Sequence, residues 1–203
     1  MTAQTQNYVF ADQPGASPAA PALFLFHGTG GNEHQFLDLA TELKPGARRI
    51  APRGDVSESG ALRYFRRTGE GRYDMADLAR ATRKMAGFVG ERLGVERPDE
   101  VIGLGYSNGA NILASVLFEA PEQFDAAVLM HPLIPFAPKP QPELKNKRVL
   151  ITAGRRDPIA PAPATEELAA YFKAQGAAIS IAWHDGGHEI QREELLAIRE
   201  FLV

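Results

Sequence analysis

The sequence contains no cysteine among its 203 residues. Disulfide bonds, thiolate metal sites and cysteine nucleophiles are therefore excluded. No apolar run approaches the ~20 residues needed to cross a bilayer, and residues 1–7 lack the basic start and apolar core of a signal peptide. The net charge of −3 gives no reason to expect nucleic acid or an anionic membrane as a partner. These absences favour a cytoplasmic protein without a membrane span, although a secreted protein without disulfides would have the same composition.

What is present is typical of a globular chain, with 44% hydrophobic and 23% charged residues. A chain of this length buries roughly 70% of its unfolded surface when it folds as one unit. No internal repeat or shift of composition marks a boundary. We therefore expect a single domain over residues 1–203, present as a monomer or homodimer.

Short apolar runs alternate with helical patterns, which indicates an α/β fold with a mostly parallel central sheet and helices on both faces. The expected strands lie at residues 8–10, 22–26, 48–51, 101–104, 126–130, 148–154 and 178–183. The expected helices lie at residues 33–43, 74–93, 110–117, about 163–175 and from about 190 to the end. Between them, a long polar loop is expected at residues 52–73. The prolines of residues 131–147 predict an extended loop without helix.

Ser107 lies at the centre of the segment Gly-Tyr-Ser-Asn-Gly, between an apolar run and a helical pattern. Strand, tight turn and helix with a serine at the apex form the pattern called a nucleophile elbow. Such a turn holds the hydroxyl exposed beside a base, which a weak nucleophile requires. Gly105 and Gly109 leave space where a Cβ would press on neighbouring elements. The pattern predicts Ser107 as a nucleophile.

Loops at the carboxyl ends of parallel strands carry the functional groups of such sheets. Asp157 follows the strand at 148–154, and His188 follows the strand at 178–183. The chain order serine, aspartate, histidine is the one expected with an elbow of this type. His184 is the alternative base, but it directly follows the strand and is expected to pack beside the sheet. Glycines between the two histidines prevent a helical metal pair, so we expect neither metal nor cofactor.

The oxyanion of an acyl-transfer reaction needs two backbone N–H donors. Asn108, the residue after the nucleophile, is expected to provide one, and Thr29, in the glycine-rich turn after the strand at 22–26, the other. We interpret His27 as a structural support of that turn and His131 as an anchor of its loop.

These motifs together resemble the α/β-hydrolase superfamily, and specifically the small phospholipase/carboxylesterase family that includes acyl-protein thioesterases. The resemblance rests on residues 25–33 (LFHGTGGNE), 105–109 (GYSNG), 154–159 (GRRDPI) and 187–189 (GHE). Asn108 is typical of a bacterial carboxylesterase-like branch rather than the eukaryotic thioesterases. The resemblance implies a three-layer α/β-hydrolase fold without a large lid domain, and a Ser-His-Asp triad.

The expected function is hydrolysis of carboxylic esters with small to medium acyl chains through an acyl-enzyme. The alternatives are an acyl thioesterase or lysophospholipase-type activity, a lyase or perhydrolase with the same triad, and a noncatalytic binding protein on this fold. The expected partner is a small ester. Candidate substrate-contacting residues are Phe65, Arg63, Arg66, Ile134 and Ile159. The arginines of residues 52–73 either form solvated ion pairs or place one guanidinium in the pocket to favour anionic substrates.

Overall fold

A computed structural model describes residues 8–94 and 97–203. The absence of a signal peptide was predicted on residues 1–7, which lie outside the described residues. Within those residues, no helix combines the length and the apolar character that crossing a bilayer would demand.

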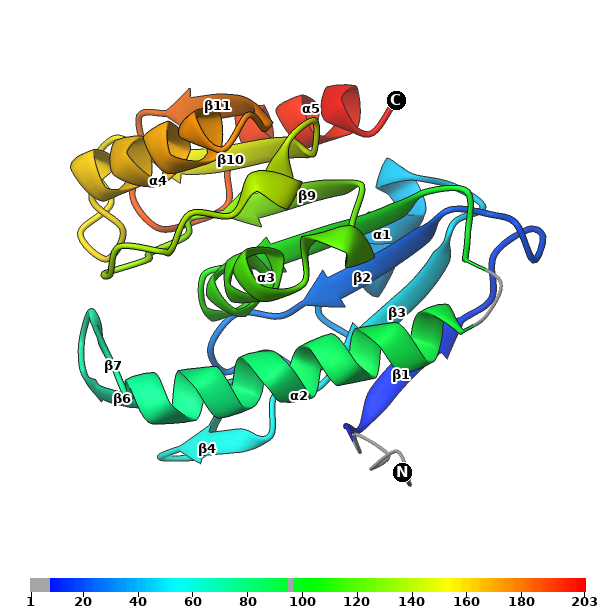
Figure 1. The fold of residues 1–203 in the computed structure, drawn as a ribbon, viewed down its shortest axis with the longest axis horizontal. Helices are drawn as coiled ribbons and strands as arrows, with labels where there is room; N and C mark the ends of the chain where they lie inside the picture. The colour runs from blue at the N-terminus through cyan, green and yellow to red at the C-terminus, as the bar shows by residue number, and fades with distance from the viewer. Residues whose placement is uncertain (1–7, 95–96) are drawn as a thin grey trace.

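A seven-stranded sheet forms the centre of the molecule (Figure 1). In spatial order its strands are β1 (Phe10–Gln13), β3 (Arg48–Pro52), β2 (Ala22–Phe26), β8 (Val101–Tyr106), β9 (Ala126–Met130), β10 (Arg148–Gly154) and β11 (Ala178–His184). β1 pairs with β3 in the antiparallel sense, and all other neighbours are parallel. The expected mostly parallel sheet is confirmed.

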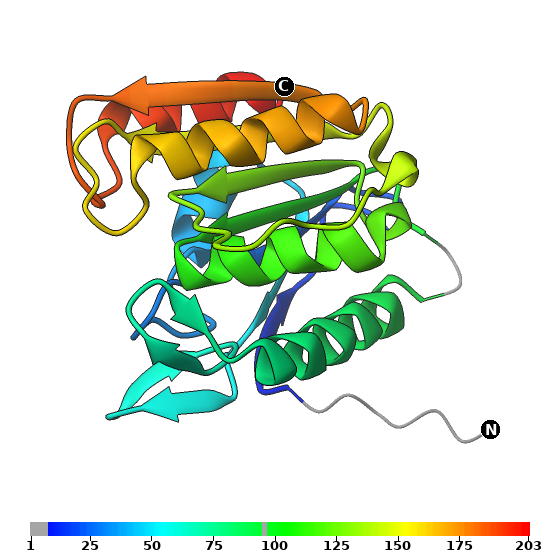
Figure 2. The ribbon, with the colours of Figure 1, turned by 60° about the vertical axis from the view of Figure 1, so that its left-hand side comes forward.

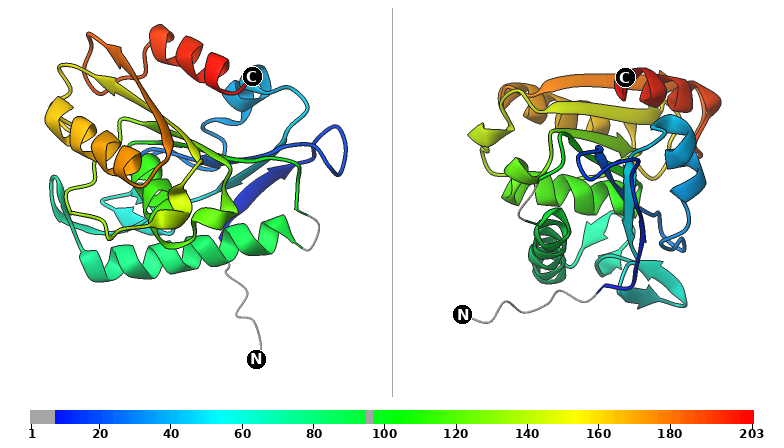
Figure 3. Two further views of the ribbon diagram at one scale, coloured as in Figure 1. Left: turned by 45° about the horizontal axis from the view of Figure 1, so that its top comes forward. Right: turned by 90° about the vertical axis from the view of Figure 1, so that its right-hand side faces the viewer.

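Helices cover both faces of this sheet and give three layers (Figure 3). They are α1 (Leu37–Leu43), α2 (Met75–Leu93), α3 (Asn108–Glu119), α4 (Ala162–Ala174) and α5 (Arg192–Phe201). The apolar faces of α2, α3 and α4 pack on one side of the sheet, and those of α1 and α5 pack on the other. This arrangement is the α/β-hydrolase fold, with no large additional domain.

The alternating side chains of each strand explain the two cores. Phe24 and Phe26 of β2 point to the side of α2 and α3, whereas Leu23 and Leu25 point to the side of α1 and α5. All four are buried. A strand covered on both faces needs apolar residues at every position, which is why β2 is a continuous apolar run.

Two elements begin later than the sequence predicts. The first helix was expected from residue 33, but α1 starts at Leu37. The side chain of Asn32 accepts a hydrogen bond from the backbone N–H of His34 at 2.9 Å, which favours a turn before the helix. The edge strand expected at residues 8–10 is β1, displaced to Phe10–Gln13, where it pairs with β3.

The prediction of an irregular loop at residues 52–73 was wrong. Two small hairpins form there, β4 (Val56–Glu58) with β5 (Ala61–Arg63), and β6 (Arg67–Gly69) with β7 (Arg72–Tyr73). Ser59 and Gly60 both adopt positive φ, of 51° and 89°, in the two-residue connection of the first hairpin. Tight hairpins favour this backbone geometry because it matches the twist of the strands.

Two short 3-10 helices complete the fold, η1 (Pro121–Gln123) and η2 (Pro142–Leu144). The second lies within residues 131–147, where helix was excluded, so that prediction was too strict. Pro142 occupies the first helical position, where its missing N–H breaks no hydrogen bond.

The parallel strands all end at one edge of the sheet (Figure 2). The last residues of β8, β9, β10 and β11 lie close together there: Tyr106 pairs with Met130, Thr152 with Met130, and Gly154 with His184. The loops that follow these strands therefore meet at one place.

Candidate active site

Ser107 occupies the turn between β8 and α3 with φ of 51° and ψ of −115°. A side chain at Gly105 would lie 2.5 Å from the carbonyl oxygen of Gly109, and one at Gly109 would collide with the carbonyl oxygen of Phe26. The two glycines therefore let strand, turn and helix approach closely. The left-handed conformation of Ser107 is strained for a non-glycine residue, and the surrounding fold holds it.

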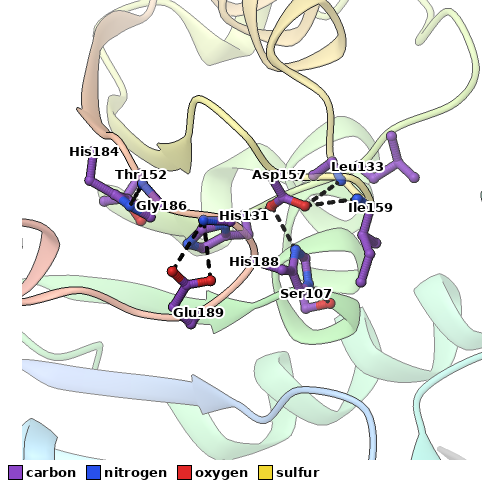
Figure 4. A network of polar contacts seen from close by, with 12 residues as sticks. Ser107, His131, Leu133, Thr152, Asp157, Ile159, His184, Gly186, His188 and Glu189 are labelled. Atoms are coloured by element: carbon purple, nitrogen blue, oxygen red, sulfur yellow. Dashed lines mark hydrogen bonds and ion pairs between the residues drawn. The ribbon is translucent and has the colours of Figure 1, made fainter.

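Ser107, His188 and Asp157 converge at the carboxyl edge of the sheet (Figure 4). Ser107 Oγ lies 2.9 Å from His188 Nε2, and His188 Nδ1 lies 2.7 Å from Asp157 Oδ2. The carboxylate is buried, whereas the imidazole is 18% exposed and lines a cavity together with Ser107. In this arrangement the hydroxyl donates to Nε2 while the N–H at Nδ1 donates to the carboxylate, so a proton can pass from Ser107 to His188.

Both oxygens of Asp157 accept hydrogen bonds. Oδ1 accepts from the backbone N–H groups of Ile159 and Ala160, at 2.8 and 3.0 Å. Oδ2 accepts from His188 and, at 2.8 Å, from Nδ1 of His131. Burial alone would raise the pKa of Asp157, but these hydrogen bonds outweigh it and lower the pKa below its ordinary value. The carboxylate stays ionised and oriented.

The loop that carries His188 is held by Tyr106, whose hydroxyl donates to the carbonyl oxygen of His188 at 2.7 Å. His184, the alternative base, is buried, and its Nδ1 accepts from the N–H of Gly186 at 3.0 Å. Its Nε2 lies 3.0 Å from Glu194 Oε1, away from Ser107. The structure therefore brings His188, and not His184, to the hydroxyl.

Sequence reasoning missed the buried polar groups beside Asp157 and His188. His131 is fully buried and lies between Asp157 and Glu194, which belongs to α5. His131 was interpreted as an anchor of its loop. Its place directly after β9, at the same edge as Ser107, was the signal that could have found it. Glu194 gave no such signal, because a glutamate in a first helical turn is common.

Within residues 8–94 and 97–203, two groups of side chains come close enough to share a metal ion, with ligand atoms within 4.8 Å of one another. They are His131 with His184 and Glu194, and His131 with Asp157 and His188. Glu194 Oε1 already accepts from the N–H of Gln191 at 2.8 Å, and Oε2 accepts from Thr152 Oγ1 at 2.5 Å. Hydrogen bonds within the protein thus account for the orientation of this carboxylate.

Thr29 and Asn108 lie beside Ser107 and line the same cavity. The Thr29 turn is tied to the first hairpin, because Gly30 N–H donates to the carbonyl oxygen of Leu62 at 2.9 Å. Asn108 is buried, and its Oδ1 accepts from the N–H of Tyr64 at 2.8 Å. The side-chain oxygen of Asn108 thus holds the segment that follows the first hairpin.

His27 directly precedes this turn and supports it through hydrogen bonds. Its Nε2 accepts from the N–H of Gly54 at 2.8 Å, and its backbone N–H donates to Tyr64 Oη at 3.1 Å. Burial lowers the pKa of His27, so the ring is neutral and can accept from Gly54. This agrees with the structural role expected for His27.

A cavity of about 290 Å³ lies over Ser107. Its other lining residues include Arg63, Arg67, Tyr73, Asn111, Leu133 and Ile159. Arg63 is only 5% exposed, and its Nη1 donates to Thr29 Oγ1 at 2.8 Å. Arg63 and Arg67 share one acidic partner, Glu58, at 3.3 and 2.9 Å. Glu70 lines the same cavity, so two guanidinium groups and a carboxylate lie at its wall.

Three of the expected substrate contacts lie elsewhere. Phe65 is fully buried and packs edge-on against Tyr73, with ring centroids 4.8 Å apart. Arg66 points away to Asp74 and Asp77. Ile134 lines a neighbouring, more apolar cavity. None of these three residues lines the cavity over Ser107, which differs from the expectation. Phe65 and Arg66 lie in the connection between β5 and β6, where their side chains pack on Tyr73 and pair with acidic residues of the chain.

The fold and this arrangement define an α/β-hydrolase. Comparisons with known proteins agree: the model of the dienelactone hydrolase family matches residues 73–193. The chain belongs to this family, which is consistent with the resemblance found in its motifs. It is a hydrolase of the dienelactone hydrolase and carboxylesterase type.

Individual relatives cover nearly the whole chain. The putative hydrolase MhqD of Bacillus subtilis (strain 168) is 40% identical over 181 residues, which are 88% of this chain and 90% of that protein. The Bacillus cereus carboxylesterase is 35% identical, with a TM-score of 0.88 over 96% of this chain and 93% of that one. YahD, whose structure was solved with malic acid, is 28% identical, with a TM-score of 0.87 over 97% and 98% of the two chains.

Proposed function

We propose that this protein is a serine esterase that hydrolyses carboxylic esters with small to medium acyl chains. The observation that carries the proposal is the contact of Ser107 Oγ with His188 Nε2, at 2.9 Å. The other ring nitrogen of the same histidine, Nδ1, contacts Asp157. This geometry suits a hydroxyl nucleophile with an adjacent general base oriented by a carboxylate.

In the proposed reaction, Ser107 Oγ attacks the ester carbonyl carbon while His188 Nε2 takes its proton. Asp157 stabilises the imidazolium that forms. The backbone N–H groups of Thr29 and Asn108 donate to the oxyanion, an interaction worth about 3 kcal/mol of barrier for each donor. The proton on His188 then passes to the departing alcohol, and the acyl group remains on Ser107. Water, deprotonated by His188, attacks the acyl-enzyme, and the acid leaves as Ser107 regains its proton.

The cavity supports a substrate of modest size that carries a carboxylate. Its volume of about 290 Å³ suits a short or medium chain. Arg63 and Arg67 at its wall provide charge and planar donors for a second anionic group. The malic acid of the YahD structure, a dicarboxylic acid, is in keeping with this preference. Acyl thioesters are the second candidate, since the same nucleophile and oxyanion donors serve either leaving group.

Labelling with a fluorophosphonate probe tests the proposal directly. The wild-type protein should become labelled at Ser107, and Ser107→Ala should lose labelling together with roughly 10⁴- to 10⁶-fold of its ester hydrolysis. Ser115→Ala is the matched control, because Ser115 lies in the same helix and only donates to the carbonyl oxygen of Asn111. Wild-type protein without labelling would instead indicate a binding protein on this fold. A panel of p-nitrophenyl esters and thioesters of increasing acyl length would then define the substrate.

A further inference from the structure

His131 and Ser107 occupy equivalent places after neighbouring strands. Tyr106, the last residue of β8, pairs with Met130, the last residue of β9, and the next residue of each chain segment turns sharply. Ser107 has φ of 51° and His131 has φ of 50°. The backbone N–H of Ser107 donates to Met130, and that of His131 donates to Thr152, both at 2.8 Å. A left-handed conformation at a buried histidine is uncommon and calls for a reason.

Both ring nitrogens of His131 face carboxylates. Nδ1 lies 2.8 Å from Asp157 Oδ2, and Nε2 lies 3.2 Å from Glu194 Oε1 and 3.1 Å from Glu194 Oε2. A neutral imidazole carries one donor and one acceptor, so one of its nitrogens would point a lone pair at a carboxylate oxygen. Two donors are available only when the ring is doubly protonated.

Neither carboxylate next to His131 is a better site than its ring for the second proton. Glu194 accepts from the backbone N–H of Gln191 and from Thr152 Oγ1, so donors already approach both of its oxygens. Asp157 accepts from two backbone N–H groups at one oxygen and from His188 at the other. Burial alone would lower the pKa of His131, but the hydrogen bonds to Glu194 and Asp157 outweigh it and raise the pKa above its ordinary value.

We propose that His131 is a positioning residue of the reaction: a resident imidazolium that holds Asp157 from behind and sets the basicity of His188 through the oxygen they share. This inference rests on the proposed roles of Ser107, His188 and Asp157. It adds a second histidine, whose ring is fully buried.

The electrostatics follow from the groups around the ring. The titratable groups that face His131 are Asp157, Glu194, His184, His188 and Tyr106. Two carboxylates without an imidazolium between them would place two negative charges behind His188. With His131 protonated, the buried cluster has a net charge of −1 before the reaction, and it becomes neutral when His188 takes the proton of Ser107.

His131 and His188 also repel each other when both are charged, since their ring centroids are 5.1 Å apart. The charge on His131 therefore disfavours a premature proton on His188 and keeps its Nε2 free to accept from Ser107. Without His131, Asp157 would face His188 alone and stabilise a resting imidazolium too well. The enzyme would then need a higher pH to become active.

Nuclear magnetic resonance of ring ¹⁵N reads the protonation of His131 without any assay of activity. At pH 8 an ordinary histidine, with a pKa of about 6.5, is neutral. We expect both ring nitrogens of His131, assigned by their loss in His131→Gln, to show the shifts of an imidazolium at this pH. A neutral ring at pH 8 would overturn the proposal, even if the protein proved to be an esterase.

The kinetic arm measures the rate of fluorophosphonate labelling against pH. In His131→Gln the acid limb of this profile should move to higher pH by roughly two units, from the loss of one charge about 5 Å away at an effective dielectric constant near 20. His184→Gln is the matched control, because His184 contacts Glu194 but neither Asp157 nor Ser107. Its acid limb should stay in place.

An acid limb at the same pH in the wild type and in His131→Gln would refute the inference. An equal shift of the acid limb in His131→Gln and in His184→Gln would also refute it. If His131→Gln does not fold, the ring shifts of the wild-type protein, assigned through the bonds of the imidazole, still decide the question. Absent labelling of the wild type would refute the proposed function instead, so the two failures are distinguishable.

Discussion

The guanidinium of Arg63 donates a hydrogen bond from Nη1 to the side-chain hydroxyl of Thr29, at 2.8 Å. This contact joins the first hairpin to the turn proposed to bind the oxyanion. Arg63 is buried, and burial, followed by the nearby charge of Arg67, lowers its pKa from the ordinary value. A buried guanidinium stays protonated and needs acceptors for its N–H groups. Thr29 therefore matters for the fold as well as for the proposed reaction.

Replacing Thr29 with valine keeps the shape of the side chain and removes the acceptor. We expect the free energy of unfolding to fall by roughly 1.5–3 kcal/mol, the usual range for a hydrogen bond to a charged group. Thr29→Ser, which retains the hydroxyl, should unfold like the wild type in urea. Equal midpoints for the valine and serine variants would show that this contact contributes nothing.

The charge at the cavity wall gives a second prediction. Arg67→Gln should raise KM a few-fold for an ester that carries a carboxylate and leave KM for a neutral ester unchanged, because a partly exposed ion pair contributes up to about 1 kcal/mol. Arg66→Gln is its control, since the side chain of Arg66 points to Asp74 and Asp77. Steady-state kinetics at low and high salt would check this, since salt should weaken only the preference for the anionic ester. An equal rise for both esters would contradict it.

Replacement by alanine should have opposite effects on stability at Gly109 in α3 and at Gly90 in α2, because only Gly109 lies in close contact with the end of β2. A Cβ at Gly109 would meet the backbone carbonyls of Phe26 and His27, which cannot move aside easily. Gly109→Ala should destabilise the protein by roughly 1–3 kcal/mol or more. At exposed Gly90, in α2, the nearest atom to a Cβ is Gln123 Nε2 at 3.5 Å.

Gly90→Ala should therefore stabilise the protein by roughly 0.5–1 kcal/mol, the usual gain for alanine over glycine in a helix. Thermal unfolding of both variants beside the wild type measures the contrast. Unchanged stability of Gly109→Ala would argue against the tight packing of the elbow, and destabilisation by Gly90→Ala would contradict the open space around Gly90.

The pair of Glu33 with Arg53 predicts how stability depends on acid pH. Hydrogen bonds from Arg53 lower the pKa of Glu33 to about 2. Since this pKa is depressed in the folded state, the stabilisation is present above the unfolded value of about 4.3 and is lost as the pH falls towards 2. Glu33→Gln should be less stable than the wild type at pH 7.

That difference should shrink steadily below about pH 4.5. Urea unfolding of both proteins from pH 7 to the lowest pH at which they fold would test this. The other carboxylates are the same in both proteins, so their contributions cancel in the difference. A constant difference over the whole range would mean that Glu33 contributes only by packing.

The amino-acid sequence by itself determined the layered sheet and the chemistry of the elbow. Buried strands such as β2 are continuous apolar runs, and the helices that cover them carry apolar residues at helical spacing, so both periodicities are visible without coordinates. The glycines around Ser107 are equally local. Parallel strands end at one edge of the sheet. The positions of Asp157 and His188 directly after later strands were therefore enough to predict that they meet Ser107 at that edge.

Only the tertiary structure decided which side chains meet at that edge. His131 and Glu194 lie 63 positions apart, and no local pattern connects them, because their contact depends on how α5 packs on β10 and β11. The same holds for Arg63, whose neighbours Phe65 and Arg66 point elsewhere. Arg63 ends β5, whereas Phe65 and Arg66 lie in the connection between the two hairpins, where no strand alternation fixes the side-chain direction. Local periodicity specifies elements, whereas contacts between distant segments require the packed fold.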